Sequence, residues 1–338
     1  MEAYKQDLPR QLPWVEKYRP KQIDHIIFHQ DTKQSLKKFI NSKSLPHLLF
    51  YGPSGSGKTS TITCCANEIY GDYVSYMVLK LNASNERGIE IVRTKIKNFV
   101  SSKNSIFLPG ELGKIFKMVI LDEIDSMTGE AQAMLRQTIE KNSSTTRFCL
   151  ICNDIDKINM ALQSRFTIYR FAPLKISDMK IRLSDISKIE NIKYEPDVID
   201  AIIKISKGDM RSAINTLQHA YLTSESIVTV DDVYKISGHC VPSINKYIFD
   251  NLLLVSKNKI SLSECVEIIN STVDEHNITI FNLLEELKNI VMESTFSLNQ
   301  KIYLIDNFAQ NEIYNTVNVD TKNILMVISS LFVLIDKN

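Results

Sequence analysis

A chain of 338 residues is too long for one ordinary hydrophobic core, so its length predicts two or three domains. Hydrophobic residues at 44% and charged residues at 23% are ordinary for a globular protein, and the net charge of +1 excludes a uniformly basic nucleic-acid binder. The N-terminus lacks the apolar core of a signal peptide, and the most apolar segment, residues 324–335, is too short to span a bilayer. We expect a soluble, intracellular protein with no membrane partner.

Short apolar runs alternate with longer amphipathic ones over the first half of the chain. Strands are expected at residues 47–52, 76–84, 117–125, 146–153 and 166–171, and helices at about 58–69, 88–100 and 131–141. The third of these strands is continuously apolar, which is typical of a parallel strand buried on both faces. The alternation predicts a doubly wound α/β domain.

The fourth predicted strand contains a C-x-x-C pair, Cys149 and Cys152. No second pair and no pair of histidines follows at ligand spacing, so two small buried residues are expected there rather than half of a zinc site. The six cysteines of the chain are few and irregularly spaced for a disulfide framework, which favours a reducing compartment.

The pattern becomes helical after Pro173. Helices at about residues 176–190, 196–206 and 209–222 predict a small three-helix unit. A linker is expected at 237–243, followed by four or five amphipathic helices, of which 324–335 would be a buried terminal one. The predicted domains are residues 1–172, 173–236 and 237–338.

The segment GPSGSGKT at residues 52–59 follows a predicted strand and opens a predicted helix, which is the context that a phosphate-binding loop requires. Gly55 and Gly57 allow backbone N–H groups to turn toward phosphate oxygens. Lys58 is expected to reach the β- and γ-phosphates, and Thr59 to bind Mg²⁺. The segment predicts a site for a nucleoside triphosphate.

Polar residues end three of the predicted strands, and ligand chemistry gathers at the carboxyl ends of parallel strands. Asp122 is expected to hold the metal through its water shell, and Glu123 to polarise an attacking water, which predicts hydrolysis as well as binding. Asn153 is expected to orient the water or contact the γ-phosphate, and Asn82 to hydrogen-bond Glu123. Each asparagine could instead only cap a turn.

The order of the motifs closely resembles the small subunits of replication factor C, the eukaryotic sliding-clamp loader. These motifs are LPWVEKYRP, GPSGSGKTS, LNASNERGI, VILDEID, TRFCLICN, LQSRF and GDMRSAINTL. The resemblance covers about residues 12–240 and is strongest to the subunit called five in animals. It implies an α/β AAA+ ATPase with a Rossmann-like P-loop core, a small helical lid and an all-α collar that assembles five subunits into a ring.

The resemblance also implies roles for single residues. Asn153 is similar to the residue termed sensor 1, Arg211 to sensor 2, and Asn82 to the partner that restrains the catalytic glutamate. The implied catalytic set is Lys58, Glu123, Asn153, Arg165 and Arg211, with Thr59 and Asp122 at Mg²⁺. The implied ATP contacts are Val15, Tyr18, Arg19, Pro20, Gly52, Pro53, Ser54, Gly55, Ser56, Gly57, Lys58, Thr59, Ser60, Asn153 and Arg211.

Arg165 lies in the segment LQSRF. In the family, the arginine of a Ser-Arg-Cys motif points across the subunit interface into the neighbour's ATP site. Arg165 is therefore implied to be an arginine finger acting in trans, rather than a solvated arginine at a strand start. The sequence departs from the family at Ser54 and Ser56, which replace Pro and Thr, at Ile124, which replaces Ala, and at Phe166, which replaces Cys. None of these departures removes a group that the chemistry requires.

Six basic residues against two acidic ones give residues 80–103 a local charge of +4. A charged helix face is normally only solvated, but the ring of this family tracks the DNA backbone through this region. Arg87, Arg93 and Lys97 are therefore the expected phosphate contacts. Since such contacts read no sequence, a primed double-stranded/single-stranded junction is the expected DNA.

The resemblance implies a nuclear protein of DNA replication and repair that works in a hetero-pentamer with other replication factor C subunits. It would use ATP to open the sliding clamp and load it on DNA. Two alternatives remain open. A homohexameric AAA+ motor such as a helicase would need an aromatic pore loop, for which the sequence offers no good candidate. A scaffolding subunit that binds ATP without turnover would not need Glu123 and Arg165.

Overall fold

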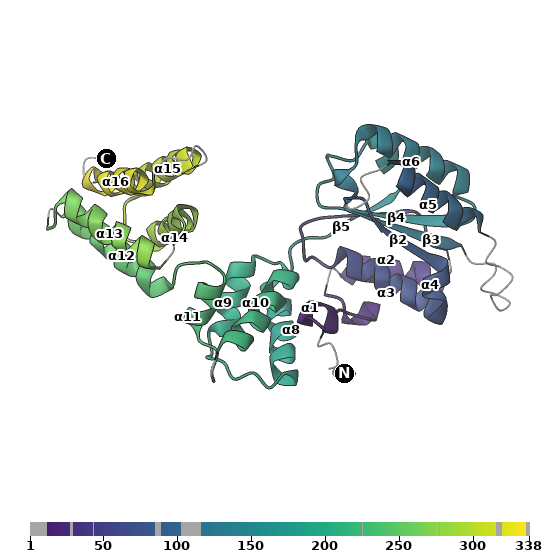
Figure 1. The fold of residues 1–338 in the computed structure, drawn as a ribbon, viewed down its shortest axis with the longest axis horizontal. Helices are drawn as coiled ribbons and strands as arrows, with labels where there is room; N and C mark the ends of the chain where they lie inside the picture. Colours follow the sequence, from purple (N-terminus) through teal and green to yellow (C-terminus); the bar gives the residue numbers. More distant parts are fainter. Residues whose placement is uncertain are drawn as a thin grey trace, which may run out of the picture. The chain divides into compact units, whose positions relative to one another are not determined.

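The computed structural model describes residues 12–27, 30–42, 44–84, 89–102, 116–224, 226–257, 259–276, 278–315 and 320–335 (Figure 1). The chain forms two compact units. The first comprises Met1–Ile192 and Ile202–Gln218, and the second Lys193–Ala201 and His219–Asn338. Two helices, α9 (Val198–Ser206) and α10 (Met210–Thr223), run from one unit into the other.

The first unit is built around a five-stranded parallel sheet in the order β2-β3-β4-β1-β5. Its strands are β1 (Leu48–Tyr51), β2 (Val78–Asn82), β3 (Lys117–Asp122), β4 (Thr146–Cys152) and β5 (Thr167–Arg170). The α/β prediction is confirmed. The second strand is shorter than predicted, because residues 74–77 form a helical turn, α4 (Val74–Met77).

Helices cover both faces of this sheet (Figure 1). They are α2 (Gln30–Asn41), α3 (Lys58–Tyr70) and α4 on one face, and α5 (Ile89–Ser101) and α6 (Gly129–Asn142) on the other. Each face closes its own apolar core, and alternate residues of β1 supply both: Phe50 packs on the α3 side and Leu49 on the other. The unit also contains α1 (Trp14–Lys17), α7 (Met160–Gln163) and α8 (Ile176–Ile189).

The C-x-x-C pair is explained by its position in β4. Both thiols are buried, as predicted, with Cys149 in the core on the α3 side and Cys152 in the core on the opposite side. Side chains three residues apart in a strand point to opposite faces of the sheet. The two thiols therefore cannot converge on one metal ion.

The second unit contains the remaining helices. They are α11 (Val230–Ile236), α12 (Pro242–Ser256), α13 (Leu262–Glu275), α14 (Ile280–Glu293), α15 (Leu298–Asn315) and α16 (Thr321–Val333). The apolar C-terminal segment is a buried helix, as predicted, with Ile328 and Phe332 in the core of α12–α16. The predicted linker ends where Pro242 occupies the first turn of α12. None of the helices in the described ranges is long and apolar enough to cross a bilayer.

Sequence periodicity missed α11, although its start has a strong local signal. Thr229 and Asp232 form a capping box, in which each side chain accepts a hydrogen bond from the backbone of the other residue. The helix has only seven residues, so it presents too few apolar positions for a 3.6-residue period to emerge.

His47, directly before β1, generates a prediction about pH. Its Nδ1 accepts a hydrogen bond from the backbone N–H of Phe148 at 3.1 Å, and its ring lies between Phe148 and Phe166 at centroid distances of 5.7 and 5.6 Å. Burial, and secondarily Arg147, lowers the pKa of His47 from its ordinary 6.5 to about 4. At a pH below 6.5, His47 therefore takes up a proton in the unfolded chain, whereas in the native state it stays neutral down to a pH of about 4.

We expect the free energy of unfolding to fall by on the order of 1–3 kcal/mol as the pH drops from about 6.5 to about 4. Urea denaturation of the full chain across this range measures the effect. The variant His47→Gln should lose most of this pH dependence. An equally steep pH dependence in the variant would assign the effect to other groups.

Candidate functional site

The predicted phosphate-binding loop joins β1 to α3. It leaves the sheet at Gly52, where a side chain would clash with the backbone oxygen of Phe171, 2.0 Å from the position of a Cβ. Gly55 (φ +61°) and Gly57 (φ +93°) take left-handed conformations that L-residues avoid. Gly57 is also the N-cap residue of α3, so the loop ends at a helix N-terminus, which favours anions.

Lys58 is the buried cation of this loop, with 7% of its surface exposed. Its Nζ donates hydrogen bonds to the carbonyls of Gly52 at 2.7 Å and Pro53 at 2.8 Å, and to Oδ1 of Asn153 at 3.0 Å. None of the ion pairs in the described part of the chain involves this ammonium group. Burial lowers its pKa, and the nearby Asp122 carboxylate opposes that shift. A buried ammonium held by neutral oxygens suits an anionic ligand.

The acidic pair lies at the end of β3, beside this loop. Oδ2 of Asp122 accepts a hydrogen bond from the hydroxyl of Thr59 at 2.7 Å, so the two predicted metal-binding residues are in contact. Mg²⁺ bound with a nucleotide needs only one or two protein ligands, because phosphates and waters supply the rest. The Asp122–Thr59 pair fits that requirement.

Glu123 has a left-handed backbone, with φ 55° and ψ 41°. For a residue with a Cβ this conformation costs on the order of 1–2 kcal/mol. The backbone N–H of Glu123 donates to Oδ1 of Asp122 at 3.0 Å, and its carbonyl accepts from the hydroxyl of Ser126 at 2.7 Å. These contacts hold the turn, and the Glu123 side chain lines the same pocket as Lys58 and Asn153.

Arg211 lies in the first turn of α10, in the part of that helix that belongs to the first unit, and lines the same pocket. Asp209, two residues before Arg211, caps the helix. Its Oδ1 accepts hydrogen bonds from the backbone N–H groups of Arg211 at 2.8 Å and Ser212 at 3.0 Å. Its other oxygen accepts from the hydroxyl of Ser54 at 2.6 Å. Ser54, where the family usually has proline, thereby ties the loop to the helix that carries Arg211.

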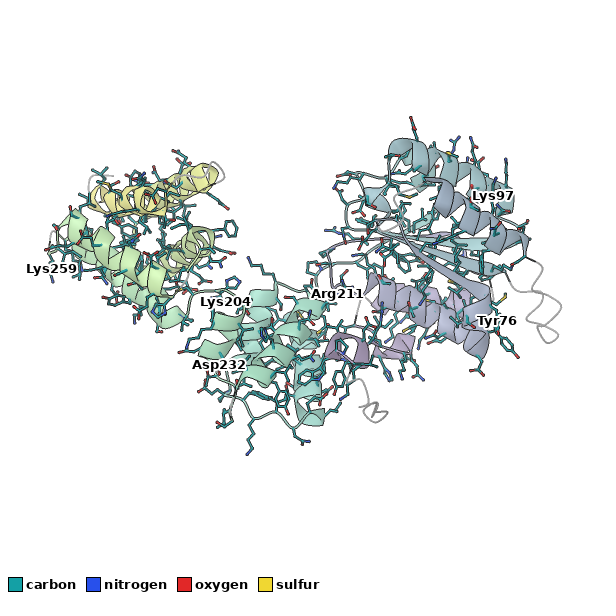
Figure 2. The ribbon with its side chains drawn as sticks, in the orientation of Figure 1. Tyr76, Lys97, Lys204, Arg211, Asp232 and Lys259 are labelled. Carbon is teal, nitrogen blue, oxygen red and sulfur yellow. The ribbon has the colours of Figure 1, made fainter. Side chains whose placement is uncertain are left out.

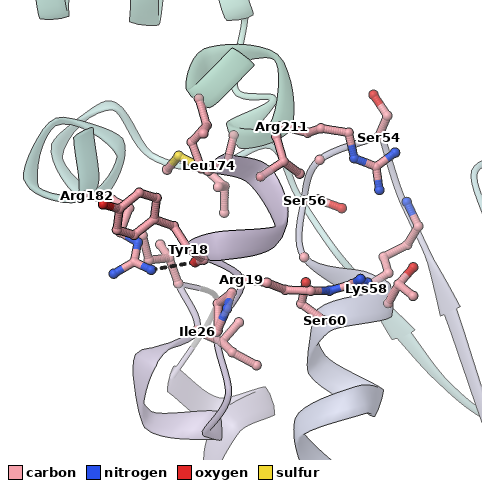
Figure 3. A pocket seen from close by; sticks show the side chains of 18 of the residues that line it. Tyr18, Arg19, Ile26, Ser54, Ser56, Lys58, Ser60, Leu174, Arg182 and Arg211 are labelled. Carbon is pink, nitrogen blue, oxygen red and sulfur yellow. Dashed lines mark hydrogen bonds between the residues drawn. The ribbon is translucent and has the colours of Figure 1, made fainter. Parts of the chain in front are cut away.

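One pocket gathers most of the predicted site (Figure 3). The predicted residues that line it are Val15, Tyr18, Arg19, Pro20, Ser54, Gly55, Ser56, Gly57, Lys58, Thr59, Ser60, Asp122, Glu123, Asn153 and Arg211. Gly52 and Pro53 contribute through their carbonyls on Lys58.

The pocket also contains residues that sequence reasoning missed, namely Glu16, His25, Ile26, Ile27, Cys152, Leu174, Arg182, Met210 and Ile214. Met210 and Ile214 are spaced i,i+4, so they share one face of α10 next to Arg211, a signal that the sequence offered. No local sequence motif marks Arg182 as a pocket residue, because it is the tertiary fold that brings α8 to the pocket.

Arg165 is placed differently. It follows α7, its guanidinium pairs with Oε1 of Glu140 on α6 at 2.7 Å, and 42% of its side chain is exposed. Nε of Arg136 lies 3.6 Å from the same carboxylate oxygen. Of the residues that the structure describes, those lining the pocket do not include Arg165. The adjacent Phe166 is buried against His47, so the residue that departs from the family pattern fills the core.

Asn82 is paired with Asp122 in the register of β2 and β3, one residue away from Glu123. Its Oδ1 accepts hydrogen bonds from the backbone N–H and the hydroxyl of Ser84, at 2.9 and 2.8 Å. Of the three expected DNA contacts, Arg87 and the side chain of Arg93 lie outside the described residues. Lys97 is exposed on α5 (Figure 2).

The closeness of Gly55 to Asp209 generates a prediction. A Cβ on Gly55 would lie 1.7 Å from Oδ1 of Asp209, in addition to the strain of its positive φ. We expect Gly55→Ala to separate the loop from α10 and to weaken nucleoside-triphosphate binding by about tenfold or more. Equilibrium binding to the full chain measures this. Gly129→Ala, at the start of α6 with nothing within 4 Å, should bind as the wild type does.

Comparisons with known proteins agree with this geometry. Residues 48–174 match the ATPase family associated with various cellular activities (AAA), and residues 182–222 match the RCF1/5-like AAA+ ATPase lid domain. The RuvB Holliday junction branch migration motor of Thermotoga maritima shares the fold, with a TM-score of 0.50 and 17% identity. This likeness covers 77% of this chain and 86% of that chain.

Three relatives extend over nearly the whole length. A replication factor C small subunit of Acanthamoeba polyphaga mimivirus is 68% identical over 97% of this chain and 95% of its own length. Replication factor C subunit 5 of Dictyostelium discoideum is 41% identical over 89% of this chain and 92% of its own length. Replication factor C subunit 5 of Homo sapiens is 41% identical over 93% of this chain and 89% of its own length. With the AAA+ core, the lid and the phosphate-binding pocket in place, the chain belongs to the replication factor C small-subunit family of AAA+ ATPases.

Proposed function

We propose that this chain is a clamp-loader subunit that binds and hydrolyses ATP within a hetero-pentamer and thereby helps to open a sliding clamp and load it at primer–template junctions. The observation that carries the proposal is the pocket of the first unit. It brings together a buried lysine, a Thr–Asp pair, a glutamate, an asparagine and an arginine from α10. This combination suits hydrolysis better than storage of a nucleotide.

The polar residues of the pocket, and Asn82 beside it, have distinct roles in the proposed reaction. Lys58 and Arg211 neutralise the charge of the phosphates, and Asn153 orients the attacking water, whose proton Glu123 accepts. Thr59 and Asp122 would hold Mg²⁺, which would withdraw negative charge from the phosphate oxygens. Asn82 restrains Glu123 until DNA and clamp are bound. Its register beside Asp122 brings its backbone next to the turn of Glu123, while its Oδ1 accepts two hydrogen bonds from Ser84.

The proposed site is completed by a neighbouring subunit. Arg165 is partly exposed, pairs with Glu140 and does not line the pocket of its own chain, which supports an action in trans. The finger would stabilise the charge that develops on a phosphoryl group bound to the neighbour. The proposed core is residues 1–172, the lid 173–236 and the collar 237–338, the last making the contacts that join five subunits.

The proposed partners are the other replication factor C subunits, the sliding clamp and a primed double-stranded/single-stranded DNA junction. The proposed compartment is the nucleus or, as the 68% identical mimivirus relative suggests, another site where DNA is replicated. Lys97 on α5 supports DNA contact, because it is an exposed basic side chain on a helix of the core.

The composite site is tested with Arg165→Ala. The full chain alone should bind ATP but hydrolyse little. In the assembled complex with clamp and primed DNA, the variant should lower turnover at the neighbour's site by about 10³-fold. ATP affinity of the variant chain itself should be unchanged, since the pocket lacks Arg165. Single-turnover hydrolysis in a complex whose other sites are inactivated isolates this step.

Arg170→Ala is the matched control, because Arg170 is an exposed arginine of the same segment. Unchanged turnover with Arg165→Ala would show that Arg165 is not an arginine finger. If the wild-type chain alone forms a ring and hydrolyses ATP briskly, the clamp-loader assignment fails and a self-assembling motor replaces it. If ATP binds to the complex without turnover, the scaffolding alternative replaces it.

The DNA contact is tested with Lys97→Ala. Because a phosphate contact reads no sequence, we expect weaker binding to every primed junction and a salt dependence reduced by about one counterion. Fluorescence anisotropy with the assembled complex at several salt concentrations measures both. Lys188→Ala, an exposed lysine of α8, is the control. An unchanged salt slope with Lys97→Ala would show that α5 does not touch phosphates through this residue.

A further inference from the structure

The segment that forms one wall of the pocket has little intrinsic stability. Residues 14–20, named here the N-terminal strap, contain the four-residue helix α1 and the pocket residues Val15, Glu16, Tyr18, Arg19 and Pro20. A helix of one turn does not form by itself in water, and α1 has no side-chain cap at Pro13. The position of the strap must therefore come from contacts with the rest of the first unit.

Most of those contacts lead to α8 and α10, and one leads to α3, where the thiol of Cys64 donates to the backbone oxygen of Pro20 at 3.1 Å. The guanidinium of Arg182 donates to the backbone oxygen of Tyr18 at 2.7 Å, and the hydroxyl of Tyr18 donates to Oε1 of Glu190 at 2.5 Å. Nζ of Lys17 donates to the same carboxylate oxygen at 2.6 Å. The backbone N–H of Trp14 donates to Gln218 at 2.9 Å. Tyr18 is thus held at both ends, and Figure 3 shows its bond with Arg182 beside the pocket.

These contacts differ in weight. The side chain of Lys17 is 48% exposed, and an exposed ion pair contributes little. That of Glu190 is only 18% exposed, so its removal would leave the half-buried hydroxyl of Tyr18 without its acceptor. The position of Glu190 is also informative, because it ends α8, where the helix dipole disfavours an acidic side chain. The hydrogen bonds from Lys17 and Tyr18 of the strap compensate for that placement.

Both groups keep the protonation state that the hydrogen bond requires. Burial, reinforced by the bond to Glu190, raises the pKa of the Tyr18 phenol, which remains a donor at neutral pH. For Glu190, burial acts to raise the pKa, but hydrogen bonds from Lys17 and Tyr18 outweigh it and hold the pKa below its usual value. The carboxylate is therefore ionised and accepts both bonds.

We propose that Glu190, together with Arg182, is a positioning residue for the nucleotide: it fixes Tyr18 and so couples the wall of the ATP pocket to helix α8. Glu190 does this from outside the pocket, whereas Arg182 also lines it. The inference rests on the proposed function, because it takes the pocket to bind ATP. Coupling is reciprocal, so bound ATP must tighten the strap against α8 as much as this contact tightens binding.

The chain carries its own probe of this coupling. Trp14 is its single tryptophan, lies in the strap with 7% of its surface exposed, and meets the ring of Tyr18 edge-on at 6.3 Å. ATP should therefore protect Trp14 of the wild-type full chain from acrylamide quenching. In Glu190→Ala, Trp14 should be quenched more readily without ATP, and ATP affinity should fall about fivefold or more. In the assembled complex KM should rise while kcat is unchanged.

Three comparisons make the test specific. Asp185→Ala removes an exposed carboxylate from the same helix and should behave as the wild type does. Glu190→Gln retains an acceptor for Tyr18 and should restore most of the affinity. If the alanine variant fails to fold, Tyr18→Phe, which removes the donor of the same hydrogen bond, replaces it and should show the same easier quenching and weaker binding. Because Glu190 acts through the phenol, adding Glu190→Ala to Tyr18→Phe should weaken binding much less than it does in the wild-type chain.

The outcomes separate this inference from the proposed function. If wild-type chain and complex bind ATP but Glu190→Ala has unchanged affinity, or lowers kcat instead of raising KM, the positioning role is overturned while the clamp-loader proposal stands. Additive effects of Tyr18→Phe and Glu190→Ala would also overturn it. If the wild type does not bind ATP in either form, the proposed function fails and this inference falls with it.

Discussion

A positive charge buried in a protein must be surrounded by oxygen atoms, and the first unit is organised around one such charge, the ammonium group of Lys58. The oxygens come from the end of β1, through Gly52 and Pro53, and from the end of β4, through Asn153. These strands are neighbours in the sheet, so their ends meet at the same edge. The strand order and the shape of the loop thus both serve to surround the ammonium group of Lys58, the first residue of α3, with oxygen atoms.

The phosphate loop connects the sheet to the helices that follow it in sequence. Gly55 must lack a side chain because Asp209 occupies that space, and Ser54 binds the same carboxylate. Asp209 in turn caps the helix that carries Arg211. The strap contacts α8 through Tyr18 and α10 through Trp14. The nucleotide pocket is thus built from segments that any movement of α8 and α10 within the unit would disturb.

Much of this site was predictable because short motifs carry it. The loop at residues 52–59 and the acidic pair at Asp122 and Glu123 are contiguous in sequence, and strand periodicity places them at one edge of a parallel sheet. Arg182 and Glu190 were not predictable, because they reach the strap only through the tertiary fold, across more than 160 residues of chain. The turn α4 and helix α11 were missed because elements of four and seven residues show no clear period.

The left-handed backbone of Glu123 has a consequence for how this sequence can change. Glycine would adopt that conformation without steric conflict, so the fold by itself would be more stable with glycine at this position. The retained glutamate marks a place where the native state is kept below its attainable stability for the sake of a carboxylate in the pocket. Sequence drift in a copy of this chain that no longer needed this carboxylate would be expected to start at this turn, well before it reached the core of the sheet.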